Sequence, residues 1–330
     1  MGSADQLLAL VKSHVEGNDK RFLSVASQMA ASEARQGHVT VAAELKKLIE
    51  RAREQNKSFT TQASPIHLSL SSLLPKGELA HLLSVTAPDV RLPELVLPPE
   101  TELRLKRILT EQQQQERLRQ YNLSPRRKIL LIGPPGSGKT LTAHALAGEL
   151  SLPLMTILLE GVITKFMGET AAKLRLVFEA MTMQRGVYLF DEFDAIGSRR
   201  SATNDVGEIR RVLNSFLQLL EQDVSLGLIV AATNHPELLD PALFRRFDDV
   251  IEFQLPDQEV VGRILRARLS PFNTKKVAWT RVLSEAEQLS HADITRAADE
   301  AAKQAVLAGH TRVDTDMLLQ ALQERRSARS

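Results

Sequence analysis

The chain has 330 residues, of which 43% are hydrophobic, enough for a sizeable buried core. Charged residues make up 25% and nearly cancel at a net charge of +2, so the chain lacks the strongly basic balance of a protein that coats nucleic acid. The absence of cysteine excludes disulfides, thiolate metal sites and a cysteine nucleophile. No apolar run approaches the roughly 18 residues of a membrane span, so we expect a cytoplasmic protein without one.

The N-terminal third has two contrasting parts. Residues 1–55 predict three short amphipathic helices, because apolar side chains recur at helical spacing, as in the stripe Leu8, Val11 and Val15. We interpret them as a helical bundle that acts as an adaptor and binds a partner. Residues 56–100 hold six of the fourteen prolines and predict a linker that lies on a domain surface.

A helix rich in Glu, Gln and Leu is predicted next, over about 101–119, with the run from Gln112 to Gln115 on a solvated face. Continuously apolar runs, typical of buried strands, then occur at 128–132, 155–159, 187–190 and 226–231. Helical stretches separate these runs, near 139–150, 169–184 and 207–221. The alternation predicts an α/β fold over residues 101–256, with a parallel sheet covered by helices on both faces. Residues 257–330 show only helical patterns and predict an all-helical lid subdomain.

The strongest motif is GPPGSGKT at residues 133–140, which fits G-x-x-x-x-G-K-[ST] and lies between a predicted strand and a predicted helix. Glycines at these positions let consecutive backbone N–H groups face phosphate oxygens beside a helix N-terminus. Lys139 is expected to reach the β and γ phosphates of ATP, and Thr140 to hold Mg²⁺. The predicted nucleotide contacts are Pro135, Gly136, Ser137, Gly138, Lys139, Thr140 and Leu141.

A second motif, VYLFDEFDAIG at residues 187–197, is an apolar strand that ends in adjacent carboxylates. We predict that Asp191 binds the Mg²⁺ shell and that Glu192 orients and deprotonates the attacking water. A third strand ends at Asn234. Because ligands gather at the carboxyl ends of parallel strands, Asn234 is expected beside Lys139 and Glu192, where it holds the water or senses the γ phosphate. The adjacent His235 precedes a proline and is interpreted as a turn residue.

Two adjacent arginines, Arg245 and Arg246, lie in the stretch DPALFRRFDDVIEF at residues 240–253. Phosphoryl transfer uses such a cation to stabilise charge in the transition state. From the residues alone, a catalytic arginine and a plain surface arginine are equally good interpretations.

In this order, the motifs closely resemble those of the narrow-sense AAA family of ATPases, which includes katanin, spastin and membrane-bound metalloprotease unfoldases. The resemblance covers residues 95–326 and is most specific over 128–253. It implies that Arg246 is the arginine finger that completes the site of a neighbouring subunit, with Arg245 as backup, and therefore that the protein is a homo-hexamer with ATP sites between subunits. Many members carry a second arginine three residues later, where this chain has Asp249. Stand-alone bacterial members, some encoded beside a subtilisin-like protease, have the most similar layout.

Members of the family also carry an S-G-A-D turn near the adenine and ribose. This chain has Ser290-His291-Ala292-Asp293. The resemblance therefore places His291 and Ala292 at the nucleotide, although for the histidine itself we favour the alternative, a turn that is simply remodelled.

The stretch TKFMGE at residues 164–169 sets Phe166 and Met167 on a predicted turn, before a helix that begins at Glu169 and Thr170. By itself, the pair is best interpreted as a hydrophobic plug that folds back on the core. The resemblance instead implies a pore loop of Lys165, Phe166, Met167 and Gly168, which grips a polypeptide with adaptable apolar surfaces.

Two functions are compatible with these motifs. The first is an ATP-dependent remodeller or unfoldase that threads a polypeptide through a central pore, with a possible partner protease. The alternative is a P-loop motor or loader that acts on nucleic acid through Arg199, Arg200, Arg210 and Arg211. An aromatic pore loop favours the first, and we expect nucleic acid to be an unlikely partner.

Overall fold

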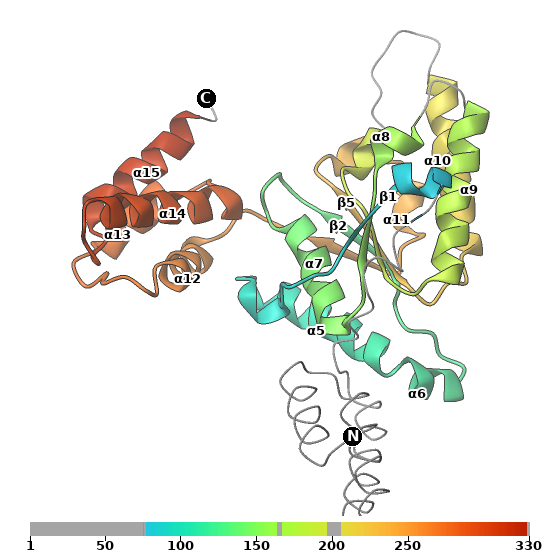
Figure 1. Cartoon of the computed structure of the whole chain (residues 1–330), viewed down its shortest axis with the longest axis horizontal. Helices are drawn as coiled ribbons and strands as arrows, with labels where there is room; N and C mark the ends of the chain where they lie inside the picture. The colour runs from blue at the N-terminus through green and yellow to red at the C-terminus, as the bar shows by residue number, and fades with distance from the viewer. Residues whose placement is uncertain (1–74, 76, 164–166, 197–205, 329–330) are drawn as a thin grey trace, which may run out of the picture. The chain divides into compact units, whose positions relative to one another are not determined.

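The computed structural model describes residues 75, 77–163, 167–196 and 206–328. The chain divides into two compact units, residues 1–67 and 68–330, and the described residues all belong to the second (Figure 1). The predicted N-terminal adaptor over residues 1–55 lies outside the described residues.

The core of this unit is a six-stranded sheet with the strand order β1-β3-β4-β5-β2-β6. Five strands run parallel, and β1 pairs antiparallel with β3 at one edge. The strands are β1 Leu83–Thr86, β2 Lys128–Ile132, β3 Leu154–Ile157, β4 Val187–Phe190, β5 Leu228–Thr233 and β6 Asp249–Glu252. All four residues of β4 and all six of β5 are buried, as continuously apolar central strands require.

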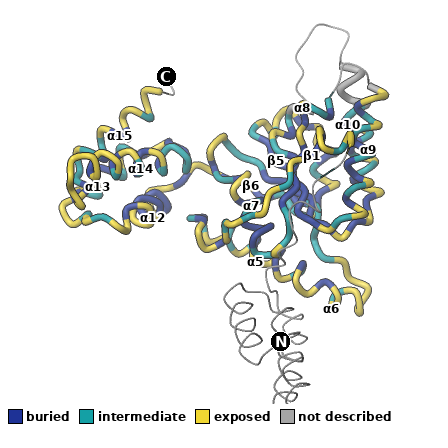
Figure 2. The backbone as a smooth tube through the Cα atoms, in the orientation of Figure 1, coloured by how far each residue is buried: buried dark blue, intermediate teal, exposed yellow. Residues whose placement is uncertain are grey.

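Side chains of each strand alternate between two buried clusters, one on each face of the sheet. One cluster joins Leu130, Tyr188 and Phe190 to α9 (Met167–Met183) and α10 (Val206–Gln222). The other joins Ile129, Leu131 and Leu189 to α5 (Pro99–Gln113) and α7 (Lys139–Leu150). The predicted α/β fold with helices on both faces is therefore confirmed, and Figure 2 shows the buried sheet between exposed helical surfaces.

The predicted helix over 101–119 is two helices, α5 and α6 (Gln115–Gln120), interrupted at Gln114. The expected solvated face is wrong in part, because Gln112 and Gln115 are buried. Gln112 Nε2 donates a hydrogen bond to the Arg126 carbonyl at 2.7 Å, which satisfies the buried amide.

Part of the expected linker belongs to the sheet. Residues 77–98 contain the short helix η2 (Gly77–His81), the strand β1 and the short helix η3 (Leu92–Glu94). Leu92, Leu95 and Leu97 are buried against the α5 and α7 face. The linker interpretation is therefore wrong for these residues, because their leucines contribute to the core in spite of the flanking prolines.

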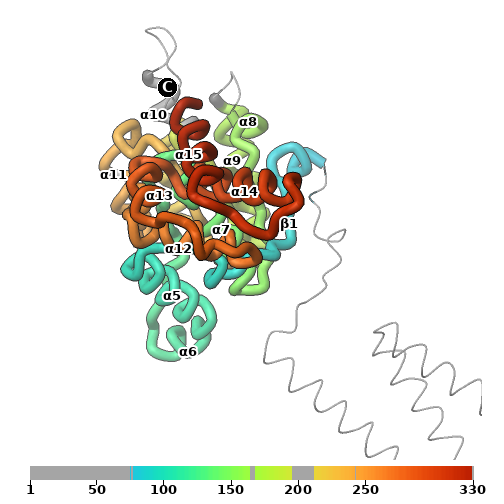
Figure 3. Tube along the Cα trace, turned by 90° about the vertical axis from the view of Figure 1, so that its left-hand side faces the viewer, coloured from blue at the N-terminus to red at the C-terminus, as the bar shows by residue number. Residues whose placement is uncertain are grey.

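Residues after 257 form only helices, as predicted. They are α12 (Gln258–Arg268), α13 (Trp279–Glu285), α14 (His291–Leu307) and α15 (Thr315–Ser327), which share a third buried cluster. Asp257, Ser290 and Asp314 accept backbone N–H bonds at the N-termini of α12, α14 and α15, so each of these helices begins at a side-chain cap. Figure 3 turns this helical lid toward the viewer. Among the described helices, none has the length and apolar character of a bilayer span.

Candidate nucleotide site

The P-loop connects the end of β2 at Ile132 to the start of α7 at Lys139. Gly136 and Gly138 have φ angles of 73° and 102°, a region that favours glycine. A Cβ atom on Gly136 would lie 2.7 Å from Ser290 Oγ, so the loop also needs glycine there for the close approach of the lid. Ala292 N donates to the Gly136 carbonyl at 3.0 Å, which joins α14 directly to the P-loop.

The Lys139 side chain, at the start of α7, is buried against this loop. Its ammonium donates to the carbonyls of Gly133 (2.7 Å) and Pro134 (2.9 Å) and to Asn234 Oδ1 (2.8 Å). Burial lowers the pKa of Lys139, and the charges of Asp191 and Asp194 partly oppose that shift. The predicted placement of Asn234 beside Lys139 is confirmed.

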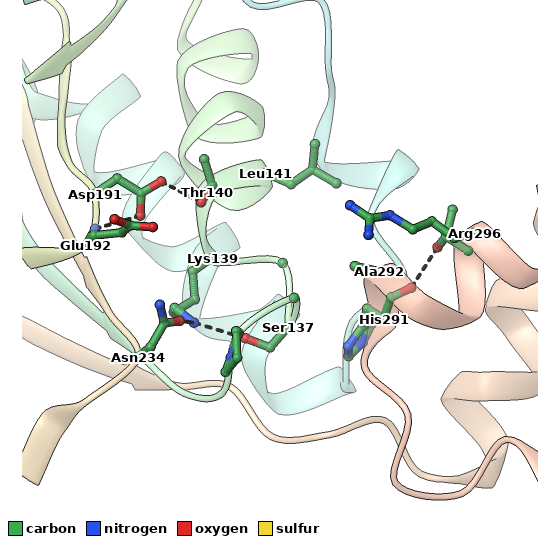
Figure 4. Close-up of a pocket in the computed structure, with 14 residues that line it drawn as sticks. Ser137, Lys139, Thr140, Leu141, Asp191, Glu192, Asn234, His291, Ala292 and Arg296 are labelled. Carbon is green, nitrogen blue, oxygen red and sulfur yellow. Dashed lines mark hydrogen bonds between the residues drawn. The ribbon is translucent and has the colours of Figure 1, made fainter. Parts of the chain in front are cut away.

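Two oxygen ligands suited to Mg²⁺ face each other across the site. Thr140 Oγ1, at the start of α7, donates to Asp191 Oδ2 at 2.7 Å, just beyond the end of β4 (Figure 4). Mg²⁺ prefers oxygen ligands and usually combines one or two carboxylates with substrate phosphates. The described residues contain no cluster of three or more His, Cys, Asp or Glu that could hold a metal.

Glu192 follows Asp191 with a φ of 49°, an uncommon value for a residue with a side chain. The turn fixes it, because Glu192 N donates to Asp191 Oδ1 at 3.0 Å. The backbone thereby separates the two carboxylates, and the Glu192 side chain is exposed at the cavity that both residues line.

Asp194 positions Asn234, a role that the sequence analysis did not detect. Its Oδ1 accepts from Thr233 Oγ1 at 2.9 Å and from Asn234 N at 3.4 Å. Asp194 lies three residues after Asp191, in η4 (Phe193–Ile196), so the loop after β4 is tied to the end of β5.

A cavity of about 540 Å³ collects most of the predicted site residues. Its lining includes Asp191, Glu192, Asn234, His291, Ala292 and every residue from Pro135 to Leu141. It also includes Thr295 and Arg296, which the sequence analysis did not single out. Figure 4 shows residues of the P-loop, the strand ends and α14 facing this space.

A neighbouring cavity of about 450 Å³ is lined mainly by apolar residues. Val96 and Leu97 come from the stretch expected to be linker, Leu141 from α7 and Ile264 from α12. Such a slot suits a flat heterocycle. His291 lines both cavities.

The His291 ring has two buried nitrogens that lack a hydrogen-bond partner among the described residues. Burial lowers the pKa of His291, and the nearby Val96 backbone partly opposes the shift. The His291 imidazole therefore occupies the boundary between the polar and the apolar cavity.

Arg245 and Arg246 do not line either cavity. Both are exposed, and the Arg246 guanidinium forms an ion pair with Glu221 near the end of α10. Asp249 forms ion pairs with Arg104 of α5 and, at 3.8 Å, with Arg126. The residue at the position of a second arginine therefore has a structural role, because it joins α5 to the start of β6.

The predicted pore loop is only partly described. Lys165 and Phe166 lie outside the described residues, as do Arg199 and Arg200, and the side chains of Met167, Arg210 and Arg211 are not described. The helix α9 begins at Met167, two residues earlier than expected. Gly168 therefore lies in the first turn of a helix.

Comparison with known proteins places these motifs in a family. Residues 129–255 match the family described as "ATPase family associated with various cellular activities (AAA)". An AAA family ATPase of Sinorhizobium fredii is 33% identical over 311 residues, which cover 93% of this chain and 91% of that protein. Proteasome-activating nucleotidases of Methanococcus vannielii and Thermococcus kodakarensis are each 35% identical over 63% of this chain, which spans about half of their length (53% and 54%).

Among solved structures, the AAA domain of FIGL-1 superposes with a TM-score of 0.59 at 21% identity, covering 79% of this chain and 92% of that one. This likeness supports the fold. The similarity to the Sinorhizobium protein over nearly the whole of both chains establishes the family. The chain belongs to the AAA family and is an ATPase that hydrolyses ATP.

Proposed function

We propose that this chain is the subunit of a homo-hexameric ring that hydrolyses ATP between subunits and threads a polypeptide through its central pore. The observation that carries the proposal is the position of Arg246. This arginine is exposed and lies outside the nucleotide cavity of its own chain, so it can complete an ATP site only on another chain. Its ion pair with Glu221 is half exposed on both sides and is therefore weak enough to exchange for a phosphate.

Within one chain, the residues divide the chemistry of ATP hydrolysis. Lys139 would bind the β and γ phosphates, and Thr140 and Asp191 would supply oxygen ligands to Mg²⁺, whose charge would neutralise that of the phosphates. Glu192 takes a proton from the attacking water, while Asn234 orients that water or the γ phosphate. Pro135 to Leu141, together with His291 and Ala292, surround the remainder of the nucleotide.

A polypeptide is the substrate that the relatives favour. Two of them are named proteasome-activating nucleotidases, and the sequence places Phe166 and Met167 where the resemblance implies a pore loop. An aromatic ring and a thioether contact many kinds of side chain, which suits a translocated chain of varied sequence. In this proposal a partner protease would receive the translocated polypeptide.

A mixing experiment tests whether the arginine acts in trans. Arg246→Ala and Glu192→Gln should each abolish nearly all ATP hydrolysis when expressed alone. Mixing the two should restore part of it, because Glu192→Gln subunits supply Arg246 to neighbours that retain Glu192. A mixture as inactive as its components, under conditions where the subunits exchange, would contradict shared sites.

A second experiment separates polypeptide from nucleic acid. Casein should stimulate the wild-type ATPase, and Phe166→Ala should remove that stimulation while keeping basal hydrolysis. Tyr121→Ala is the matched control, since Tyr121 is an aromatic side chain 72% exposed at the end of α6. Stimulation by single-stranded DNA that survives Phe166→Ala would favour the nucleic-acid motor.

A further inference from the structure

The turn that carries Arg246 connects α11 (Pro241–Phe244) to the start of β6. Before the arginine side chain, the backbone is held by a hydrogen bond from Arg246 N to the carbonyl of Leu243 at 3.0 Å, and Leu243 is fully buried. After it, Phe247 is buried in the same apolar cluster as Leu243. The exposed arginine therefore projects from a backbone that the core holds on both sides.

Asp248 adds an anchor of a different kind. Its Oδ2 accepts hydrogen bonds from Arg127 N at 2.8 Å and from Lys128 N at 2.9 Å, and its own N donates to the Lys128 carbonyl at 2.8 Å. A carboxylate that accepts from backbone N–H groups makes charge-assisted bonds, which are stronger than neutral ones. Three bonds thus join the residue two positions after Arg246 to the beginning of β2.

The same segment at the beginning of β2 also holds the partner of Arg246. The Arg127 guanidinium forms an ion pair with Asp223, whose side chain is fully buried, and donates to the Ser225 carbonyl at 2.9 Å. Asp223 lies two residues after Glu221, which is paired with the Arg246 guanidinium. The start of β2 therefore fixes both the turn that carries the arginine and the helix end that its side chain contacts.

The adjacent carboxylate of Asp249 bonds differently. It forms its ion pairs with the side chains of Arg104 and Arg126, whereas Asp248 bonds the backbone of β2. An ion pair between long side chains loses entropy when it holds one geometry, so it restrains position less well than a bond to the backbone of a packed strand. Of the two carboxylates, Asp248 is thus the one suited to set where the turn lies.

We propose that Asp248 is a positioning residue for Arg246, because it fixes the turn of the arginine to the strand that carries the P-loop of its own chain. β2 leads directly into the P-loop, and β6 runs parallel beside it from the pair Ile129 and Asp249 onward. A cation that stabilises a transition state must be placed accurately, since a small misplacement costs much of the rate. The inference rests on the proposed action of Arg246 on a neighbouring subunit and adds the residue that holds this arginine in place.

The first test is Asp248→Ala in the full chain. We expect kcat for ATP hydrolysis to fall about 10- to 100-fold, while affinity for a non-hydrolysable ATP analogue stays within about twofold, because the P-loop is intact and only the arginine is misplaced. Asp314→Ala is the matched control, since Asp314 Oδ1 also accepts from a backbone N–H, that of Met317 at 3.1 Å, at the start of α15 in the lid. It should keep a kcat close to that of the wild type. A normal kcat for Asp248→Ala would overturn the proposal.

A double variant separates positioning from general stability. Once Arg246→Ala has removed the arginine, Asp248→Ala should cause no further loss of kcat, because a residue that acts through Arg246 has nothing left to position. A further loss in the double variant, or weaker binding of the ATP analogue by Asp248→Ala alone, would assign Asp248 a general structural role and contradict the proposal.

The conservative variant Asp248→Asn tests the bonds themselves. Its amide oxygen can accept from the two backbone N–H groups without the charge, so it should keep a higher kcat than Asp248→Ala. An asparagine variant as slow as the alanine variant would contradict an anchor made by these hydrogen bonds.

Mixed subunits distinguish this inference from the proposed function on which it rests. Asp248→Ala mixed with Glu192→Gln should recover part of the hydrolysis, since the second subunit supplies a well-placed Arg246. If Arg246→Ala alone hydrolyses ATP normally, the proposed action of the arginine fails and this inference fails with it. If Arg246→Ala is inactive and is rescued by mixing while Asp248→Ala is normal, only the positioning role fails.

Discussion

The phosphate end of the nucleotide site is polar and comes from the α/β core, whereas the adjoining slot is apolar and comes from three distant parts of the chain. At the phosphate end, Asp191 and Asn234 directly follow β4 and β5, and Lys139 begins α7 after the loop that follows β2. Lys139 donates to Asn234 Oδ1 at 2.8 Å, and Asp191 Oδ2 accepts from Thr140 Oγ1 at 2.7 Å. In the slot, Val96, Leu141 and Ile264 meet only because the lid packs beside the sheet.

Substitutions at the two ends should therefore change ligand binding in different ways. Changes at the phosphate end should scale with the number of phosphates on the ligand, since the contacts are made to those groups. Changes in the slot should affect adenosine and ATP alike. The boundary between the ends, at Gly136 and His291, should influence the docking of the lid.

The largest effect is expected at the phosphate end, from Lys139→Ala. It removes a buried cation and leaves the oxygens of Gly133, Pro134 and Asn234 without their shared donor. We expect ATP affinity and hydrolysis to fall by at least about a hundredfold while adenosine binding changes little. Lys275→Ala, which removes an exposed lysine from a loop, is the control. Titration of each variant with ATP and with adenosine measures the affinities. An equal loss for adenosine would abolish the distinction between the two ends.

The boundary comes next, with Gly136→Ala compared against Gly309→Ala. Both glycines have a φ of 73°, so alanine introduces the same backbone strain of about 1–2 kcal/mol at either position. Only at Gly136 would the new Cβ also meet the lid, 2.7 Å from Ser290 Oγ, whereas Gly309 has open space. We expect a roughly 10- to 100-fold lower ATPase rate for Gly136→Ala and a near-normal rate for Gly309→Ala. Equal rates would mean that the lid contact is unimportant to catalysis.

These contrasts also explain what the sequence could predict. Lys139 was found from the motif G-x-x-x-x-G-K-[ST] between a strand and a helix. Asp191, Glu192 and Asn234 were found because they follow apolar strands, and parallel strands bring their carboxyl ends to one edge of the sheet. The alternation of strands and helices was sufficient to predict the phosphate end of the site and the existence of an all-helical lid.

The slot was missed for a physical reason. The strand β1 has only four residues, of which one is buried, so its pattern is too short to detect, and Pro88 and Pro93 favour a linker. Arg296 was missed because an exposed position on an amphipathic helix has no sequence signature, and only the docking of α14 brings it to the cavity. Asp249 could be assigned only when its partners Arg104 and Arg126 were seen, 145 and 123 residues away.

A moderate effect is expected in the slot from Ala267→Phe. Ala267 lines the apolar cavity of about 450 Å³, and a phenyl ring there would occupy the space suited to a heterocycle. We expect about tenfold weaker binding of adenosine, ADP and ATP alike. Ala302→Phe, elsewhere on the lid and away from both cavities, tests whether a new ring on this subdomain has a general effect. A loss confined to ATP would place phosphates in the slot and reverse the assignment of the two ends.

The smallest effect is expected from the pH dependence of stability at His291. Burial lowers the pKa of this imidazole in the folded chain, whereas in the unfolded chain it keeps its ordinary pKa of roughly 6.5. As the pH falls below that value, the unfolded chain therefore binds more protons at this residue than the folded chain does. The free energy of unfolding should therefore fall as the pH falls below that value, and the loss should level off once the pH is below the folded pKa.

Denaturant titrations of the wild type, His291→Gln and the exposed-histidine control His310→Gln, between pH 5 and 8, measure this contribution. The difference in unfolding free energy between wild type and His291→Gln should shift against the wild type as the pH falls, and His310→Gln shows how much of that shift comes from replacing any histidine by glutamine. A saturating ATP analogue should change the first difference if His291 contacts the nucleotide, since a new hydrogen bond to the ring alters the balance between its protonation states. An unaltered difference would favour the remodelled turn, in which the histidine only fills the space between the P-loop and the lid.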